Sequence, residues 1–463
     1  TPSDHNFLNN GLIRADRTPN PHLNEAKWAM QPISFTQGSN KGELSVHNDY
    51  FFQDLSKVRF QWSILADGEQ VEQGSVDGLE VAPQGSAILP IKWSQDCIQA
   101  KEYILNVQAV LVADAPLLSE GHIIARSEFP LVSDWTPTSE KDGVSPLVIT
   151  ESNGEMSIEG SFFTATFDTN LGMLSSYSVD GQEMILSGGK VNFWRAPTDN
   201  DYGASLPVHY QEWKSASDNK KLLSANHNQN PASTNLNFTW SLLGGDAIYR
   251  QHYTVHTDGS ILVHNTLDAI KGINPAAVHV AGYWQELPAE SHSNLFRFGN
   301  QFVLSPGLEK TNWYGRGPHE TAVDRKGSAF IGKYYETVEN LFTLYARPQH
   351  NGSRNDVRWV TFTGENNAGI CIEALPESEG IPKFIHFSAS HFPMEAIDSG
   401  EDKSSSQAHV RLLNPEPEIF LNIDGFQAGV ACVNSWGALP TDEHLLPFGN
   451  YSYSYHILPV RSE

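Results

Sequence analysis

Apolar and polar side chains alternate without interruption in the stretch Val58-Arg59-Phe60-Gln61-Trp62-Ser63-Ile64. Successive side chains of a β-strand point to opposite faces, so this period of two places all the apolar members on one face. The same period returns in the stretches 103–109, 163–167 and 451–457, the last with serines and a histidine on its other face. Such alternation is typical of half-buried strands in antiparallel sheets. The sequence therefore predicts a dominantly antiparallel, all-β chain.

Asp-Gly pairs punctuate these stretches at positions 67–68, 77–78, 180–181, 258–259 and 424–425. Glycine adopts positive φ without a steric penalty, and Asp tolerates the left-handed region better than most residues. Asp-Gly is accordingly a common centre of two-residue hairpin turns. We expect a tight turn at each of the five pairs.

Composition divides the chain into four segments. Residues 1–31 are too few for a domain and are expected to belong to a larger unit. Residues 32–135 predict a small sandwich whose size matches an immunoglobulin-like module. A stretch rich in Pro, Ser and Thr at 136–146 predicts a linker, and 147–463 then reads as a single large β-sandwich domain.

One helix is predicted against this background, close to the start of the chain. Asn20 is a suitable N-cap, and Pro21 fits the first helical position. Leu23 and Ala26 share a face with Lys27 and Met30, and the pattern ends near Gln31.

Charge and cysteine content exclude several classes of function. The 463 residues include 30 Lys and Arg against 54 Asp and Glu, a formal net charge of -24. Such a chain repels nucleic-acid phosphates and anionic membrane surfaces, so neither partner is expected. Cys97, Cys371 and Cys432 lie far apart without a CxxC pair, and the sequence contains no long apolar segment. These features favour a reduced, cytoplasmic setting.

Four blocks of sequence carry a resemblance to a known family. They are the run FLNNGLIRADRTPNP at 7–21, VAPQG at 81–85, RAPTDND at 195–201 and LNIDGF at 421–426. In this order they resemble the C-terminal part of the large β-galactosidases of glycoside hydrolase family two. The resemblance implies the end of a catalytic TIM barrel at 1–31, a second immunoglobulin-like domain, and a C-terminal domain with a galactose-mutarotase-like fold.

The resemblance also implies what this chain does not carry. A retaining glycosidase needs an acid/base carboxyl and a nucleophilic carboxylate on either side of the scissile bond. In the family both are glutamates on barrel strands upstream of the first block, and the ligands of the catalytic Mg²⁺ lie upstream too. The chain alone is therefore expected to hydrolyse no β-galactoside. It is expected to work with that upstream barrel, in a full-length enzyme that is a homo-oligomer.

Two residues near the start match a metal site of the family. Phe7 corresponds to a position that binds Na⁺ through its main-chain carbonyl, and Asn10 to one that binds it through its side-chain oxygen. Oxygen ligands suit such a hard cation. In the family this Na⁺ lies beside the galactose 6-hydroxyl, so Asn10 is expected to neighbour the substrate as well. A turn at Asn10 and a core position for Phe7 are the structural alternative.

Trp436 matches the tryptophan that the family's C-terminal domain extends into the catalytic pocket, where its flat face receives the sugar. The surrounding sequence, VNSWG at 433–437 followed by a loop through Asp442, breaks the strand alternation on both sides. This pattern favours a loop tip over a strand centre. The alternative is a core position, which is the common fate of a tryptophan.

Two other functions are compatible with parts of the sequence. The blocks GRGPHE at 315–320 and RPQHNG at 347–352 place His319, Glu320 and His350 in loops. Mutarotases use a His and a Glu as general acid and base, so a free-standing aldose 1-epimerase is one alternative. Arg316, His319 and Glu320 are ordinarily surface loop residues. A non-catalytic small subunit or carbohydrate-binding module is the other alternative.

Two polar clusters invite a metal interpretation that the sequence does not favour. Asp199 and Asp201 lie in the block 195–201, where Asx turns and strand-end hydrogen bonds are the simpler explanation. His386 and His391 are five residues apart with no third ligand nearby, so we interpret them as hydrogen-bonded core or loop residues.

Overall fold

The computed structural model describes most of the chain, in two compact units. The described residues are 11–38, 43–93, 101–137, 146–273, 279–280, 283–284, 291–376, 384–401, 409–430 and 438–462. The larger unit contains those of 1–20, 137–326 and 334–463, and the smaller unit those of 21–136 and 327–333.

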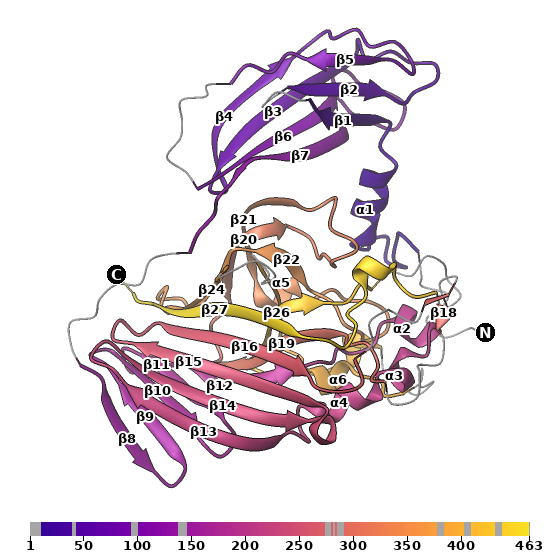
Figure 1. The fold of residues 1–463 in the computed structure, drawn as a ribbon. Coiled ribbons are helices and arrows are strands. Elements are labelled where there is room, and N and C mark those ends of the chain that lie inside the picture. The colour runs from indigo at the N-terminus through magenta and orange to yellow at the C-terminus, as the bar shows by residue number, and fades with distance from the viewer. Residues whose placement is uncertain are drawn as a thin grey trace. The chain divides into compact units, whose positions relative to one another are not determined.

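The smaller unit is a β-sandwich of a three-stranded and a four-stranded antiparallel sheet (Figure 1). Their orders are β1-β2-β5 and β4-β3-β6-β7. The strands are β1 (Ile33–Gln37), β2 (Leu44–Asn48), β3 (Val58–Ala66), β4 (Glu69–Val76), β5 (Ser86–Leu89), β6 (Glu102–Leu111) and β7 (Ile123–Ser133). Seven antiparallel strands in two sheets match the immunoglobulin-like architecture that was predicted.

Alternation along two paired strands builds the core of the smaller unit. Phe60 pairs with Ala109 and Trp62 with Val107, so the apolar face of β3 lies beside that of β6. The predicted apolar members of both strands are all buried, namely Val58, Phe60, Trp62, Ile64, Tyr103, Leu105, Val107 and Ala109. The period-two prediction is confirmed here.

Helix α1 (His22–Ala29) forms where a helix was predicted, but Asn20 does not cap it. Pro21 has helical φ and ψ and occupies the cap position, which has no side-chain hydrogen bond. Instead, the Asn20 amide donates to the Gly11 carbonyl at 2.8 Å and accepts from Arg14 Nε at 3.0 Å. The capping prediction was wrong because these contacts within the preceding loop engage the Asn20 side chain.

Residues 327–333 contribute to the smaller unit although they are distant in sequence. The Glu25 carboxylate accepts hydrogen bonds from the backbone N–H groups of Gly327 and Ser328, at 3.0 and 2.9 Å. Lys333 pairs with Glu69 at 2.9 Å. The segment is thus bound to this unit through both its backbone and its side chains.

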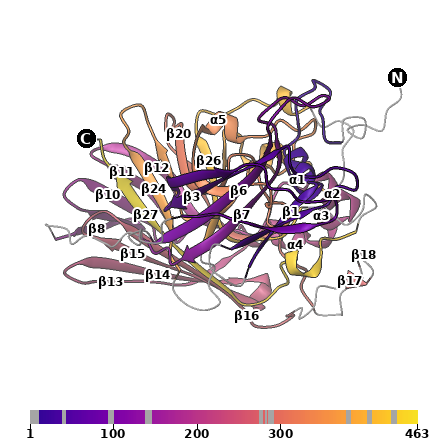
Figure 2. The ribbon, with the colours of Figure 1, turned by 90° about the horizontal axis from the view of Figure 1, so that it is seen from above.

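Two nine-stranded antiparallel sheets form the larger unit (Figures 1 and 2). Their orders are β22-β25-β26-β19-β12-β11-β10-β9-β8 and β13-β14-β15-β16-β27-β24-β23-β20-β21. The strands of the first sheet are β8 (Val148–Ser152), β9 (Glu155–Glu159), β10 (Phe163–Asp168), β11 (Met173–Val179), β12 (Gln182–Asn192), β19 (Arg297–Leu304), β22 (Arg354–Val357), β25 (Ile385–Ser390) and β26 (Ile419–Gln427). Those of the second are β13 (Lys221–Gln229), β14 (Ser233–Leu242), β15 (Ala247–His256), β16 (Ile261–Ala269), β20 (Lys310–Gly317), β21 (Phe330–Thr337), β23 (Trp359–Thr363), β24 (Gly369–Ala374) and β27 (Tyr451–Val460). The predicted all-β class is confirmed.

Short elements complete the larger unit. They are α2 (Asp199–Gly203), α3 (Leu206–His209), α4 (Gln211–Ala216), α5 (Val338–Leu341), α6 (Met394–Ile397), a small hairpin β17 (His279–Val280) and β18 (Tyr283–Trp284), and the 3₁₀ turns η2 (Leu243–Gly245), η3 (Val410–Leu412) and η4 (Asp442–His444). Among the described residues, no helix has the length and apolar character needed to cross a bilayer.

The strand β27 shows where the alternation rule underestimates burial. Tyr453, Tyr455 and Ile457 lie in the core as expected, but Ser454 and His456 on the opposite face are buried as well. The strand is central in its sheet, with β16 paired at one edge and β24 at the other, so it is far from the sheet's open edges. The polar face of β27 was expected in solvent, but Ser454 and His456 are buried.

The Asp-Gly prediction holds at the hairpins of 67–68, 180–181 and 258–259, and it fails at 77–78, where the described chain forms no turn or hairpin, and at 424–425. Asp67 and Asp180 have φ of 46° and 50°, and the glycines that follow them also have positive φ, as hairpin turns of this kind require. Asp424 and Gly425 instead lie inside β26, where Asp424 pairs with Gly299 and Gly425 lies at a register shift in the ladder. Gly425 is needed there because a Cβ would lie 2.3 Å from the Tyr453 ring. The turn prediction at 424–425 was wrong.

Candidate functional site

The three residues predicted to touch sugar or Na⁺ lie outside the described part of the chain. Phe7 and Asn10 precede Gly11, and Trp436 falls in the segment 431–437. The structure describes what holds the chain on either side of that segment, which we call the 431–437 loop because the sequence predicts a loop there.

Arg195 fixes the chain that leads into this loop. Its guanidinium donates to the carbonyls of Ala428 and Gly429, each at 2.9 Å. It also forms a bidentate pair with Asp201, at 2.8 and 3.1 Å. Both side chains are almost fully buried, and charge-assisted bonds of this geometry hold a fixed orientation.

The last described residue before the loop, Val430, is held at both its backbone groups. Its N–H donates to Asp324 Oδ1 at 3.2 Å, and its carbonyl accepts from Asn200 Nδ2 at 2.9 Å. The neighbouring Gly429 donates to the His444 carbonyl at 2.7 Å, which ties it to the chain that follows the loop.

The chain after the loop is equally well packed. Ala438 and Leu439 are buried, and the 3₁₀ turn η4 follows directly. The Leu446 carbonyl then accepts from the Leu295 N–H at 2.8 Å. The described residues on both sides of 431–437, which form the base of the loop, are therefore held by hydrogen bonds and buried contacts.

The block 195–201 builds part of that base through local hydrogen bonds. Thr198 and Asp201 form a capping box at the start of α2, with N···O distances of 3.2 and 2.8 Å. Asp199 accepts from Arg347 Nη1 at 3.0 Å and from Gln349 at 3.2 Å. The hydrogen-bond explanation of this block is confirmed. Within the described ranges, no group of three His, Cys, Asp or Glu side chains is arranged to hold a metal ion.

The segment before α1 adds a second fixed point next to a predicted ligand. Residues 11–20 form a small loop closed by a bridge between Ile13 and Pro19. The Asn20 amide holds the Gly11 carbonyl, and Gly11 directly follows the predicted ligand Asn10.

Glu320, a candidate base of the epimerase alternative, is buried and saturated with donors. Its carboxylate accepts from Arg325 at 2.7 Å, from the Tyr345 hydroxyl at 2.9 Å and from the Gly352 N–H at 2.8 Å. Burial raises the pKa of Glu320, but Arg325 and these hydrogen bonds outweigh it and hold the pKa below its usual range. The expectation of a surface position was wrong, because Arg325 compensates the buried charge.

His350, the partner candidate, lies among cations. Its backbone N–H donates to Ala196, and its ring nitrogens lie 3.5 Å from Arg297 Nη2 and 3.2 Å from Ser353 Oγ. Burial and the neighbouring cations, Arg297 first among them, depress the pKa of His350 well below its ordinary value.

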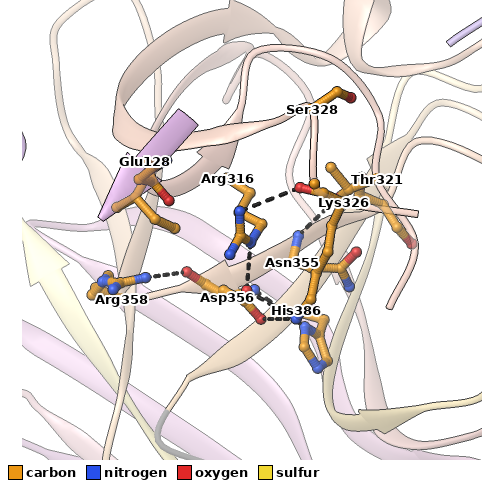
Figure 3. A network of polar contacts seen from close by, with 12 residues as sticks. Glu128, Arg316, Thr321, Lys326, Ser328, Asn355, Asp356, Arg358 and His386 are labelled. Atoms are coloured by element: carbon orange, nitrogen blue, oxygen red, sulfur yellow. Dashed lines mark hydrogen bonds and ion pairs between the residues drawn. The ribbon is translucent and has the colours of Figure 1, made fainter. Parts of the chain in front are cut away.

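A polar hub at Asp356 was not foreseen from the sequence (Figure 3). Its carboxylate pairs with Arg316 at 2.6 Å and with Lys326 at 2.8 Å, and its carbonyl accepts from Arg358 at 2.6 Å. Burial would raise the pKa of Asp356, but Lys326, Arg316 and His386 together outweigh it and hold the pKa below its usual range. Asp356 has a positive φ of 52°, a conformation that Asn and Asp adopt most readily after glycine. Nothing in the local sequence marks such a hub.

His386 joins the same hub through its ring. Nδ1 accepts from the Asp356 N–H at 3.4 Å, and the side chain is buried (Figure 3). Burial lowers the pKa of His386 to about 4. His391 lies 3.0 Å from the Glu418 carbonyl and 3.2 Å from Glu309. The interpretation of both histidines as hydrogen-bonded structural residues is confirmed.

Comparisons with known proteins agree with this architecture. A family model described as "Beta galactosidase small chain" matches residues 159–457, more than half of the chain. A second, described as "Beta-galactosidase, domain 4", matches residues 44–132. Apart from residues 327–333, the first match lies in the larger unit, and the second lies in the smaller.

Curated relatives named β-galactosidase match almost the whole chain. One from Priestia megaterium is 29% identical over 98% of this chain, and one from Halalkalibacterium halodurans is 28% identical over 96%. The chain spans 41% of the length of each, in the C-terminal part. Among solved structures, a GalM/aldose epimerase homologue from C. elegans matches with a TM-score of 0.36 and 12% identity, over 67% of this chain and all of that one.

Proposed function

Because the chain belongs to the β-galactosidase small-chain family, we propose that it forms the C-terminal part of a β-galactosidase that hydrolyses terminal β-D-galactosyl residues, as in lactose. The mechanism is retaining, and both catalytic glutamates belong to an upstream barrel. This chain contributes Trp436 as a platform for the sugar ring. An indole face stacks on the apolar C–H face of a pyranose and leaves its N–H for one hydrogen bond.

The observation that supports this proposal most directly is the fixed base of the 431–437 loop. Arg195, held by Asp201, clamps the two carbonyls just before Val430. Buried residues resume at Ala438. Buried contacts on both sides of a segment restrict where its residues can lie, which suits a residue proposed to receive a sugar ring.

The proposal divides the ion sites between this chain and the upstream barrel. Na⁺ is held by the Phe7 carbonyl and the Asn10 side chain together with an upstream aspartate, next to the galactose 6-hydroxyl. Asn20 supports this arrangement by holding Gly11, the residue after Asn10. Mg²⁺ is bound entirely by upstream residues.

We propose further that the full-length enzyme is a homo-oligomer in the cytoplasm. The cysteine usage supports this compartment, since the three thiols are far apart in sequence. Cys371 on β24 is a free thiol.

The experiment is a kinetic comparison in the full-length enzyme. Trp436→Ala should raise KM for a chromogenic β-galactoside about 5- to 150-fold, the equivalent of about 1–3 kcal/mol for a lost stacking contact. Thermal stability should change little, because the proposal places Trp436 outside the core. Trp359→Ala, a half-buried tryptophan on β23, is the matched control and should leave KM unchanged.

Two results would contradict the proposal. Equal KM values for Trp436→Ala and the parent enzyme would remove the platform role. Robust turnover of the galactoside by the purified 463-residue chain would show that the hydrolytic carboxylates are not upstream.

A further inference from the structure

A pocket in the larger unit lies on the face of the first sheet that points away from the second. It encloses about 200 Å³. Four neighbouring strands, β25, β26, β19 and β12, form its floor. The loops around Arg195, His350 and Phe392 form its walls.

The floor carries a row of polar side chains from residues that are direct pairing partners on neighbouring strands. Ser388 pairs with Asn422, Asn422 with Gln301, and Gln301 with Lys190. Residues directly opposite one another in a sheet share a face, so all four point toward the pocket. The intervening Asn300 and Phe302 point into the sandwich, where Tyr455 contacts both.

The amide of Gln301 is nearly unused within the protein. Its Nε2 reaches only the Met394 sulfur, at 4.0 Å, in the contacts of the described residues. Arg297 also lines the pocket; it is 2% exposed, and its Nε has no hydrogen-bond partner in the described part of the chain. Polar groups of this kind are normally satisfied, so a pocket that leaves them open offers hydrogen bonds to a ligand.

The cations at the pocket are all balanced. Lys190 pairs with Asp218 at 2.7 Å, and Arg195 with Asp201 at 2.8 Å. Arg297 lies 3.5 Å from Asp424. No positive charge remains unbalanced among these three, so a phosphate or sulfate gains little by binding here.

The walls supply the apolar part of the site. Phe342 and Phe392 line the pocket with their ring centroids 4.7 Å apart, and Met173 and Met394 lie on the lining as well. Amides and hydroxyls on the floor both donate and accept, as hydroxyl groups require, while ring and thioether surfaces suit C–H faces.

We propose that this pocket is a second saccharide site, which binds a neutral hexopyranose unit without cleaving it. Glu395 is the one carboxylate among the described lining residues, so the pair needed for glycoside hydrolysis is missing. The site goes beyond the proposed function, since it is built wholly from this chain and needs neither Trp436 nor an upstream barrel.

The test uses the methionines of the purified chain as reporters. The sequence has five, and two of them, Met173 and Met394, line the pocket. In methyl NMR, titration with D-galactose or D-glucose should shift these two resonances saturably. Met30 in the smaller unit, which is 81% exposed, should not move.

Variants then locate the binding. Gln301→Leu removes the amide but keeps the bulk, and it should weaken binding at least about tenfold. Asn312→Leu, on β20 of the other sheet, is the matched control and should bind as the parent does. Trp436→Ala should also bind normally, which separates this inference from the proposed function.

Three outcomes would overturn the inference. They are no saturable shift with either sugar, binding lost in Trp436→Ala but retained in Gln301→Leu, and tighter binding of inorganic phosphate than of sugar at Met173 and Met394. The reporter shifts in the parent chain decide the question even if Gln301→Leu does not fold.

Discussion

Arg195 and Asp201 face each other in a bidentate ion pair whose side chains are 3% and 4% exposed. The same guanidinium binds the carbonyls of Ala428 and Gly429. The Arg195 side chain thus connects Asp201, at the start of α2, to the chain that leads into the 431–437 loop. A substitution that breaks this pair should lower the stability of the fold and displace Trp436.

Asp201→Asn tests this connection. The substitution leaves the Arg195 charge buried without its partner, so the free energy of unfolding should fall by about 3–5 kcal/mol in urea denaturation. In the full-length enzyme KM for a galactoside should rise as well, because the loop base loses its clamp.

Asp77→Asn is the control for this prediction. It removes a carboxylate that pairs with Arg59 at 2.6 Å on the surface, and stability should hardly change. If Asp201→Asn were no more harmful than Asp77→Asn, the buried pair would not hold the loop base.

Gly299 and Asp424 provide a second prediction. They pair across β19 and β26, and a Cβ on Gly299 would lie 1.8 Å from Asp424 Oδ1. Gly299→Ala should therefore displace Asp424 from Arg297 and cost about 1–3 kcal/mol, as measured by thermal unfolding. Gly449→Ala, where the nearest atom is 3.9 Å away, should be tolerated, and an equal loss in both variants would contradict the argument.

Acid should weaken the fold through His386. The pKa of this histidine is lowered to about 4 by burial, against an ordinary value of 6.5, so the folded state resists the proton that the unfolded state takes up. The stability contributed by the neutral ring is complete above pH 6.5 and is lost as the pH falls toward 4. The loss should be on the order of 2–3 kcal/mol.

His386→Asn isolates this effect. An Asn oxygen can accept the Asp356 N–H in place of Nδ1, but it does not titrate. Urea midpoints between pH 6.5 and 4 should depend less on pH in this variant than in the parent, while His47→Asn on the surface should follow the parent. Parallel pH profiles for all three proteins would refute the role of His386.

The sequence was sufficient for the strands because their signal is local. Val58 to Ile64 alternate, and the alternation alone determines which face is buried. The hairpin turns at Asp67 and Asp180 need residues that tolerate positive φ, and an Asp-Gly pair in the sequence supplies them locally. The pair Asp424-Gly425 failed because its glycine serves a contact with Tyr453, a residue that is distant in sequence.

The polar contacts of the larger unit could not be predicted for the same reason. Asp356 contacts Arg316, Lys326 and His386, which come from three separate segments, and no spacing in the sequence indicates that they meet. Glu320 was expected on the surface because a loop glutamate usually is, and only the position of Arg325 explains its burial. The residues predicted for sugar and Na⁺ came from a resemblance rather than from such contacts, and they stay predictions.

Mutarotation is the last activity for which the structure makes a prediction. Ring opening of an aldose needs a carboxylate free to take a proton from the anomeric hydroxyl and an imidazole placed to serve the ring oxygen. The carboxylate oxygens of Glu320 already accept hydrogen bonds from Arg325, Tyr345 and the Gly352 N–H. Its lowered pKa also makes it a poor base. The purified chain should therefore not speed the equilibration of α-D-galactose, followed by polarimetry, even at sugar concentrations that fill the proposed pocket. Rapid mutarotation that disappears in His350→Ala or Glu320→Gln would show that these side chains leave their present partners when sugar binds, and it would favour the epimerase function.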